Sequence, residues 1–523
     1  MTSLLTSPGT SSRTSLWTAR SPGIETDRHG LGLEAAARDV DEIVVGAGIT
    51  GLITALLLAR AGRRVTVLEA RGVGAVATGN STAKLSVLQG AHLQQVASRN
   101  TRGVTQAYVD ANEAGQRWVL DFAAEHRVPV ERRAALSYAA SPDGIATVEK
   151  EYELAQSAGL PVTLLSDAGL PFATHRAVRL ANQAQFDPML LLSALAAELR
   201  AMGGVIHDAT TVLGVRAGRP VRVRTTRGEY SCERLVLATG SPILDRGLYF
   251  AKLDAERSYA ASYRVPGAAL PPDMYLSVDG PTRSIRTAPD AAAAPGAEAG
   301  SGSEAGELLL VGGNGHGVGR HPSPASLVAD LEQWTTTHWA GAQRTHAWSA
   351  QDYATPHGVP FVGWLPRGRG RIFLATGYSK WGMTNAAQCA LTLAGDLLGE
   401  LPGWAVPMRH RMTLPAAIGT GIGMNAAVGK HYAVGWARAM TRRLPGDVPV
   451  EGSGVVGRVG LSPVGESTVA GATCRVSGVC PHLGAVLAWN DAEASWDCPA
   501  HGSRFSATGR RLEGPAKVGL ARR

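Results

Sequence analysis

A glycine-rich turn between two apolar segments limits the folds open to this chain more than any other feature of its sequence. Residues 41–71 have the sequence DEIVVGAGITGLITALLLARAGRRVTVLEAR. The short apolar run 43–45 predicts a β-strand, the longer stretch 52–61 predicts a helix, and 65–68 predicts a second strand. A strand, a tight turn, a helix and a strand in this order indicate a βαβ unit with two parallel strands.

The turn has the spacing G-x-G-x-x-G, formed by Gly46, Gly48 and Gly51. In a dinucleotide-binding turn the first glycine permits a tight bend, the second lets the backbone approach a pyrophosphate, and the third lets the helix pack on the sheet. Glu69 ends the second strand, where a carboxylate accepts hydrogen bonds from ribose hydroxyls. We therefore expect a dinucleotide site; the alternative is a glycine-rich turn in an ordinary βαβ unit.

Size and composition are those of a globular protein. The 523 residues, 45% of them hydrophobic, suffice for a large core and about two to four domains. The net charge of +8 comes mainly from scattered arginines, so we expect a solvated surface and no nucleic-acid partner. Five cysteines do not suggest a disulfide framework. No apolar run reaches the roughly 18 to 20 residues of a membrane span, and the first residues lack a signal-peptide pattern, so we expect a cytoplasmic protein.

The rest of the chain up to about residue 400 alternates between helical and strand-like segments. Residues 1–38 are rich in Ser, Thr, Gly and Pro and predict a partly disordered N-terminal arm. Residues 92–159 have apolar residues at three- and four-residue spacing and predict helices, as do residues 188–202. The low-complexity segment 288–306 predicts a disordered surface loop. Further strands are predicted at 205–206, 221–223, 232–240, 249–265 and 307–311.

A second strand, glycine turn and helix follow at residues 371–398, RIFLATGYSKWGMTNAAQCALTLAGDLL. A helix N-terminus beside an open glycine turn favours electron-rich groups, such as the carbonyl oxygens of a flavin. Residues 403–445 lack a clear core pattern and are expected to connect two domains. From residue 455 onward, short strand-like pieces separated by turns predict a small β domain.

The C-terminal segment contains two pairs of metal-binding residues, Cys480-x-His482 and Cys498-x-x-His501. Two thiolates on one iron and two imidazoles on the other hold a Rieske [2Fe–2S] cluster. Two cysteines and two histidines also make a tetrahedral zinc site, but paired zinc ligands usually lie about two to four residues apart, and C-x-H is shorter. We therefore expect the cluster. The other cysteines have no ligand spacing and are expected in the core: Cys232, Cys389 and Cys474.

Residues 446–523, with CPHLGAVLAWN and WDCPAHGSRFSATGRRLEGP, resemble a Rieske domain. Residues 40–400 resemble the FAD-dependent oxidoreductases of the D-amino-acid oxidase and glycine oxidase superfamily. Four stretches carry this second resemblance: GAGITG at 46–51, TGNSTAKLS at 78–86, ATGSPILDRGLYF at 238–250 and ATGYSKWGMTN at 375–385. The fusion resembles a bacterial subfamily of FAD-dependent oxidoreductases with a C-terminal Rieske domain, and Ser15-Leu16-Trp17 resembles its N-terminal segment.

The resemblance implies an α/β FAD-binding domain (Rossmann-like, glutathione-reductase type) with an interleaved α+β substrate domain, followed by a small all-β Rieske domain. The oxidoreductase would span 39–404, with a connector at 405–445 and the Rieske domain at 446–523. The FAD-binding parts would be about 39–100, 185–250 and 350–404, and the substrate-domain parts about 101–184 and 251–349.

The resemblance also implies two cofactors, FAD and a Rieske-type [2Fe–2S] cluster. FAD would contact Gly46, Gly48, Gly51, Glu69, Thr82, Ala83, Lys84, Gly240, Gly377, Gly382 and Met383, and the cluster ligands would be Cys480, His482, Cys498 and His501. Ala485 and Ala500 stand where many Rieske domains have an extra cysteine pair, so the cluster loops would have no disulfide. Phe505 stands where some high-potential members have a tyrosine bonded to a ligand sulfur, so we expect a lowered potential.

Four residues are candidates for acid–base or polarising roles: Lys84, Tyr259, Tyr378 and Lys380. Lys84 could polarise the flavin or the substrate or activate oxygen; it could also be a phosphate or surface contact. Aromatic residues and a lysine near a glycine turn are often packing and surface residues, which is the alternative for the other three. His316, in the sequence GNGH, is expected to be structural.

The expected activity is the oxidation of a small amine, amino acid or related substrate by hydride transfer to FAD. Electrons would pass one at a time through the cluster to a redox-protein acceptor, and the sequence leaves the reverse direction open. The alternative is an FAD/Rieske protein that passes electrons between protein partners without a small-molecule substrate. Such a shuttle more often has a second G-x-G-x-x-G for a nicotinamide donor. GNGHGVG at 313–319 follows a strand but is followed by no helix, which favours the enzyme.

Overall fold

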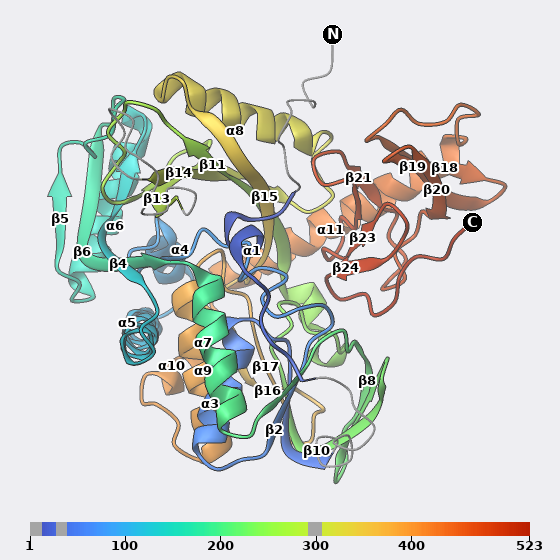
Figure 1. Ribbon diagram of the computed structural model, residues 1–523, viewed down its shortest axis with the longest axis horizontal. Helices are drawn as coiled ribbons and strands as arrows, with labels where there is room; N and C mark the ends of the chain where they lie inside the picture. Colours follow the sequence, from blue (N-terminus) through green and yellow to red (C-terminus); the bar gives the residue numbers. More distant parts are fainter. Residues whose placement is uncertain (1–12, 28–38, 291–305) are drawn as a thin grey trace.

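The computed structural model describes residues 13–27, 39–290 and 306–523. Figure 1 shows three parts: a mainly parallel sheet with its helices, a larger and mostly antiparallel sheet, and a small β domain that contains the C-terminus. Residues 1–12, 28–38 and 291–305 lie outside the described residues. The predicted disordered loop 288–306 therefore lies mostly outside them, although its first two residues belong to a strand.

The predicted βαβ unit lies at the centre of the first sheet, whose order is β16-β17-β10-β1-β2-β7. Strands β17, β10, β1, β2 and β7 are parallel, and β16 and the pair β8–β9 are antiparallel additions. Every residue of β2 is buried, as expected for a parallel strand covered on both faces. The strands are β1 (Asp39–Val45), β2 (Val65–Leu68), β7 (Val205–His207), β8 (Val212–Arg216), β9 (Val221–Thr225), β10 (Gly228–Leu237), β16 (Phe361–Trp364) and β17 (Ile372–Thr376).

Helices α3 (Ile49–Arg60), α7 (Pro188–Ala201) and α9 (Gly382–Leu398) pack together beside this sheet (Figure 1). Each begins where the sequence changes from a strand or turn to an apolar run. Asp187 caps α7, since its side chain accepts a hydrogen bond from the N–H of Met189. Small residues such as Gly51, Ala55, Ala386 and Ala390 are fully buried and allow close helix packing.

The second sheet has the order β15-β11-β14-β13-β12-β4-β6-β3, with β5 paired to β6. Its strands are β3 (Lys84–Leu85), β4 (Val130–Ala139), β5 (Val162–Leu165), β6 (Arg176–Phe186), β11 (Asp254–Arg264), β12 (Met274–Ser277), β13 (Arg283–Pro289), β14 (Glu307–Gly317) and β15 (Gln343–Ala354). The helical elements on it and beside it are α4 (His92–Arg99), α5 (Arg102–Glu125), η1 (Pro142–Gly144), α6 (Ile145–Ser157) and α8 (Pro324–His338). The short η2 (Arg246–Lys252) follows β10 of the first sheet, and its Tyr249 packs on Phe361 of β16.

The prediction of continuous helix over residues 92–159 is wrong at β4. This strand lies inside the sheet, paired with β6 on one side and β12 on the other. Its second half, Ala134–Ala139, is buried throughout, so it has no polar–apolar alternation that would have marked it as a strand. Alanine and leucine favour helices, but pairing with two neighbours outweighs that local preference.

The predicted N-terminal arm is not loose over residues 13–27. Helix α1 (Leu16–Arg20) buries Leu16 and Trp17 in the main core. The indole Nε1 of Trp17 donates to the carbonyl oxygen of Ser81 at 2.8 Å, and the hydroxyl of Ser15 donates to the carbonyl oxygen of Gly79 at 2.5 Å. This segment therefore braces the loop that leads to β3.

The expected connector is mainly helical. It contains α10 (Ala405–Arg409) and α11 (Pro415–Thr441), a 27-residue helix that extends to the C-terminal domain, where Trp436 Nε1 donates to the carbonyl oxygen of Gly484 at 3.0 Å. Only Ala417 and Ala439 of α11 are buried, which explains why no core pattern was visible. Across the described ranges, no helix combines the length and the apolar character needed to cross a membrane.

The C-terminal domain consists of a three-stranded and a four-stranded antiparallel sheet. The strands are β18 (Gly454–Val459), β19 (Ser462–Val469), β20 (Ala472–Ser477), β21 (Ala488–Asn490), β22 (Ser495–Asp497), β23 (Arg504–Ser506) and β24 (Arg511–Glu513). Its core contains the fully buried side chains of Trp496 and Phe505, next to both predicted cysteine ligands. Figure 1 shows this domain beside β15 and α11.

Candidate active site and metal centre

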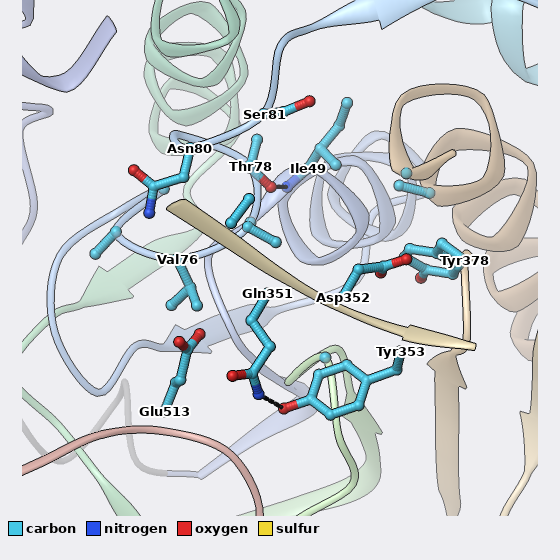
Figure 2. Close-up of a pocket in the computed structure, with 18 of the residues that line it drawn as sticks. Ile49, Val76, Thr78, Asn80, Ser81, Gln351, Asp352, Tyr353, Tyr378 and Glu513 are labelled. Atoms are coloured by element: carbon cyan, nitrogen blue, oxygen red, sulfur yellow. Dashed lines mark hydrogen bonds between the residues drawn. The ribbon is translucent and has the colours of Figure 1, made fainter. Parts of the chain in front are cut away.

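A cavity lies where the two large sheets meet, and β24 of the C-terminal domain forms part of its wall. Figure 2 shows side chains from the loop 76–81, from β15 and from β24 around it. The predicted site residues that line the cavity are Gly46, Gly48, Glu69, Thr82, Lys84, Gly240, Tyr259, Gly377, Tyr378, Lys380, Gly382 and Met383. Gly51 and Ala83 are buried behind this wall.

The glycine turn has a geometry suited to binding an anion. Gly46 has φ 109°, and a Cβ there would collide with the carbonyl oxygen of Ala238; a Cβ on Gly51 would collide with the carbonyl oxygen of Gly46. The N-cap of α3 is Gly48, which has no side chain to cap the helix. The N-terminal end of α3 therefore points its partial positive charge at the cavity, which fits a pyrophosphate.

Glu69 is positioned by two backbone N–H groups. Its Oε2 accepts from Ala47 N and its Oε1 accepts from Arg71 N, both at 2.9 Å. Burial raises the pKa of this carboxyl above its usual range, although both hydrogen bonds act in the other direction. Each carboxylate oxygen retains acceptor capacity for a further hydroxyl, so the geometry fits a ribose at this end of the cavity.

Lys84 lies in the cavity wall at the edge of the second sheet. Its Nζ donates to the carbonyl oxygen of Tyr275 at 2.6 Å and to Oγ of Ser284 at 2.7 Å. Burial, and secondarily the nearby Arg286 guanidinium, hold the pKa of Lys84 well below its usual value. Lys84 is therefore a half-buried amine in the cavity wall, held by two hydrogen bonds, and not a surface contact.

The other three candidate side chains are held by different partners. The hydroxyl of Tyr378 lies 2.8 Å from Oγ1 of Thr50 on α3. Tyr259 on β11 has its hydroxyl 3.2 Å from Nε2 of His316, whose Nδ1 in turn lies 2.9 Å from the carbonyl oxygen of Gly317. Burial raises the pKa of both phenols above 10, so both remain protonated at neutral pH.

Lys380 is half-exposed at the cavity rim, where its Nζ forms a 2.7 Å ion pair with Oε2 of Glu256. The sequence analysis missed its neighbour Asp352, whose side chain accepts a hydrogen bond from the Lys380 N–H. Burial raises the pKa of Asp352 to about 6. Gln351 and Tyr353, which flank it on β15, also line the cavity (Figure 2). No short motif marks these three residues, because β15 reaches the cavity only through long-range strand pairing.

The four predicted metal ligands meet at the tips of two loops in the C-terminal domain. The thiols of Cys480 and Cys498 are in hydrogen-bonding contact with each other. Each loop closes with a backbone turn: Gly484 N donates to the carbonyl oxygen of Cys480 at 3.0 Å, and Gly502 N donates to that of Cys498 at 3.1 Å. The hydrogen bond with Cys498 lowers the pKa of the Cys480 thiol, and a smaller contribution comes from a hydrogen bond with Ser503, which the sequence analysis missed.

The rings of His482 and His501 lie 5.2 Å apart between centroids. Nδ1 of His482 is buried without a hydrogen-bond partner, while its Nε2 lies 3.1 Å from Oδ1 of Asp245. Burial, and next the neighbouring His482, lower the pKa of His501 to about 4, so that ring is neutral at neutral pH, as a metal ligand must be.

The four residues fit a two-iron cluster. The two thiols are in contact with each other and the two imidazole centroids lie 5.2 Å apart, which suits cysteines on one iron and histidines on the other. The buried side chains of Ala485 and Ala500 occupy the positions of the extra cysteine pair, so no disulfide joins the loops.

The C-terminal domain is bonded directly to the cavity wall. Nε2 of Gln351 donates to the carbonyl oxygen of Gly502 in a ligand loop at 2.7 Å, and Nε of Arg320 donates to that of Pro499 at 2.9 Å. Arg257 of β11 is completely buried and pairs with Glu513 of β24 at 3.1 Å. The pKa of Glu513 is lowered to about 2 by Arg504 and Arg257, which outweigh burial.

Comparisons with known proteins agree with this geometry. Residues 41–395 match the family of FAD dependent oxidoreductases (DAO), and residues 465–522 match the Rieske [2Fe-2S] domain. YhfW of Bacillus subtilis (strain 168), a protein named for a Rieske 2Fe-2S iron–sulfur centre, is 30% identical over 487 residues, which is 91% of this chain and 92% of YhfW.

Solved structures share the fold of the larger part. Glycine oxidase from Geobacillus kaustophilus superposes with a TM-score of 0.59 at 17% identity, over 71% of this chain and 98% of that one. L-proline dehydrogenase from P. horikoshii superposes with a TM-score of 0.57 at 15% identity, over 71% and 96%. This chain belongs to the DAO family of FAD dependent oxidoreductases and carries a C-terminal Rieske domain, so its cofactors are FAD and a [2Fe–2S] cluster.

Proposed function

We propose that this chain oxidises a small amine, amino acid or related substrate and passes the electrons one at a time through the Rieske cluster to an external redox protein. FAD, when bound, supplies a hydride acceptor for a C–H bond beside nitrogen. Structural neighbours titled glycine oxidase, L-proline dehydrogenase and L-amino acid deaminase support a substrate of this class.

The cavity geometry supports the following assignment of binding residues. FAD would be held by Gly46, Gly48, Gly51, Glu69, Thr82, Ala83, Gly240, Gly377, Gly382 and Met383, and the cluster by Cys480, His482, Cys498 and His501. The glycines leave room for the pyrophosphate of the cofactor, and the carboxylate of Glu69 would accept hydrogen bonds from the ribose hydroxyls. Nδ1 of His482, buried and without a partner, is available to iron.

The four candidate side chains would have different roles in substrate binding and proton transfer. Tyr378, protonated, would donate a hydrogen bond that orients a substrate carboxylate. Tyr259, whose hydroxyl proton goes to Nε2 of His316, would accept one from a substrate amine. Lys380, already paired with Glu256, would act at the rim as a charged contact for substrate entry. Lys84 is the candidate for proton exchange, since burial holds its pKa well below the usual value of a lysine.

The hydrogen bond between Gln351 and Gly502 is the observation that most directly supports electron transfer from the flavin to the cluster. Gln351 lines the cavity and donates to the cluster loop, so a single side chain separates the flavin cavity from the loop that holds Cys498 and His501. Phe250 of the oxidoreductase part covers the histidine side, with its ring centroid 5.5 Å from that of His482 and 5.1 Å from that of His501. Both observations favour electron exchange inside the chain.

The test is anaerobic mixing of the purified holoprotein with a panel of amines and amino acids. Bleaching of the flavin absorbance by one of them, followed by the low-temperature EPR signal of a reduced, histidine-ligated cluster, is the expected result. Bleaching without any cluster signal would contradict the relay. Reduction of both cofactors by a reduced ferredoxin-type protein, with no response to any small molecule, would instead favour the electron-transfer alternative.

A further inference from the structure

One wall of the dinucleotide cavity comes from the Rieske domain. Arg511, Leu512 and Glu513 of β24, together with Gly514, line the same cavity as Glu69. Nη1 of Arg71 donates to the carbonyl oxygen of Leu512 at 3.1 Å, which fixes β24 against the loop that follows β2. Figure 2 shows Glu513 at the cavity on the segment coloured as the C-terminal domain.

Arg511 is a cation with spare donor capacity at this wall. Its Nη2 donates to the carbonyl oxygen of Gly514 at 2.9 Å, and its Nε is buried without any hydrogen-bond partner. Among the described residues, no carboxylate oxygen lies within 4.0 Å of its guanidinium. Glu69 and Glu513 act on it only at longer range.

Arg71 repeats this pattern at the same end of the cavity. Its guanidinium donates to the carbonyl oxygens of Leu512 and Ala75, and it too has no carboxylate partner within ion-pair distance among the described residues. The neighbouring Arg257 and Arg504, by contrast, are both paired with Glu513. Arg257 and Arg504, behind the cavity wall, are therefore paired with a carboxylate. Arg511 and Arg71, in the wall, have no such partner among the described residues.

A buried donor without a partner, such as Nε of Arg511, is costly unless an anion meets the guanidinium that carries it. The anion that the cavity is built for is the pyrophosphate of the dinucleotide, since the open N-terminus of α3 and the ribose acceptor Glu69 lie in the same cavity. Arginine is also the side chain best suited to phosphate, because its planar fork can donate two parallel hydrogen bonds.

We propose that the Rieske domain is part of the FAD-binding site, with Arg511 donating from β24 to the phosphates of FAD opposite the glycine turn. The flavin is then held between two domains, and the domain that receives its electrons also retains it. This inference depends on FAD as the cofactor but on no particular substrate.

The test measures FAD affinity in the full-length protein. Apoprotein would be titrated with FAD, following the quenching of flavin fluorescence, for wild type, Arg511→Ala and Arg511→Gln. Glutamine can still donate to the carbonyl oxygen of Gly514, so it separates the loss of the cation from a disturbed loop. Arg510→Ala is the matched control, because the exposed Arg510 is adjacent in sequence and does not line the cavity.

We expect both Arg511 variants to bind FAD about 10- to 100-fold more weakly, the effect of losing a hydrogen bond to a charged group, with Arg510→Ala unchanged. The loss should be smaller for riboflavin, which has no phosphate. The cluster EPR signal, recorded in each variant, identifies any that fails to fold. Arg511→Gln with an intact cluster signal and an FAD affinity within twofold of wild type would overturn the proposal, whatever the substrate screen finds.

Discussion

Nε2 of the predicted cluster ligand His482 lies 3.1 Å from Oδ1 of Asp245, a residue 237 positions earlier in the chain and on the oxidoreductase side of the interface. The side chain of His482 is only 5% exposed, whereas that of Asp245 is 51% exposed. When Nδ1 serves as the metal ligand, Nε2 would carry the ring proton and donate a hydrogen bond to this carboxylate. A carboxylate behind a histidine ligand makes that ligand more basic and tunes the metal.

Asp245→Asn should raise the midpoint potential of the cluster. The amide oxygen can still accept from His482, so the contact survives, but the negative charge that favours the oxidised cluster is lost. A charge-assisted bond to a half-exposed carboxylate is worth about 1 kcal/mol, which corresponds to a rise on the order of 40 mV for one electron. EPR-monitored redox titration measures it. Asp447→Asn, at an exposed position ahead of β18, should leave the potential unchanged. Equal shifts in both variants would contradict a specific role of Asp245.

Cys498→Ser should abolish the cluster and leave the flavin in place. Serine cannot supply a thiolate, and Cys498 is buried at the tip of a ligand loop. Iron and acid-labile sulfide should both be lost, together with the EPR signal of the reduced protein. The control is Cys474→Ser on β20, a half-buried cysteine that the sequence predicts to be structural. Retention of full iron and sulfide in Cys498→Ser would refute the assigned ligand set.

The parts of the site that are formed by residues close together in the chain could be predicted from the sequence. The glycine turn, Glu69 and the Cys–His pairs each depend on residues close together in the chain, because one turn or one loop forms each. The first helix of the βαβ unit begins three residues earlier than predicted, and the second strand has the predicted bounds.

The remaining features depend on contacts between residues far apart in the chain, which local sequence patterns do not predict. Strand β4 has an alanine-rich second half that favours a helix, and only its neighbours β6 and β12 make it a strand. Helix α11 has almost no buried face, so its sequence lacks the apolar stripe of a packed helix. The contacts of Gln351 with Gly502 and of Arg71 with Leu512 join residues 151 and 441 positions apart.

Lys84→Met should slow flavin chemistry without releasing FAD. Methionine fills the space of the buried lysine stem but cannot donate to Tyr275 or Ser284, nor exchange a proton. We expect the air reoxidation of dithionite-reduced flavin to slow by on the order of 10- to 100-fold, the usual scale for losing one acid–base or polarising group. Lys150→Met, an exposed lysine in an ion pair on α6, serves as the control. An unchanged rate with full FAD occupancy would make Lys84 structural.

Asp352→Asn should remove a pH dependence of stability. Burial raises the pKa of Asp352 from 3.8 to about 6, so between these values the folded protein holds a proton that the unfolded chain has released. The contribution of Asp352 to stability is thus fully present below pH 4 and is lost as the pH rises through 6, by about 3 kcal/mol at 1.36 kcal/mol per pKa unit. Urea unfolding from pH 4 to pH 7 should show wild type losing that amount relative to Asp352→Asn. Asp143→Asn, at an exposed position, should follow wild type.

Trp17→Ala should destabilise the protein and loosen the cofactor loop together. Trp17 is 1% exposed, its Nε1 donates to Ser81, and the Arg286 guanidinium lies 5.0 Å from its ring centre. Arg286 donates in turn to the carbonyl oxygens of Thr82 and Ala83, so α1 and this arginine together fix the backbone that precedes Lys84. Truncating a buried tryptophan costs about 3 to 5 kcal/mol. The melting temperature and the FAD affinity should therefore fall in parallel, while Trp364→Ala, at a 52% exposed position, should change neither. A Trp17→Ala protein with wild-type values of both would mean that the N-terminal segment packs on the fold without supporting the site.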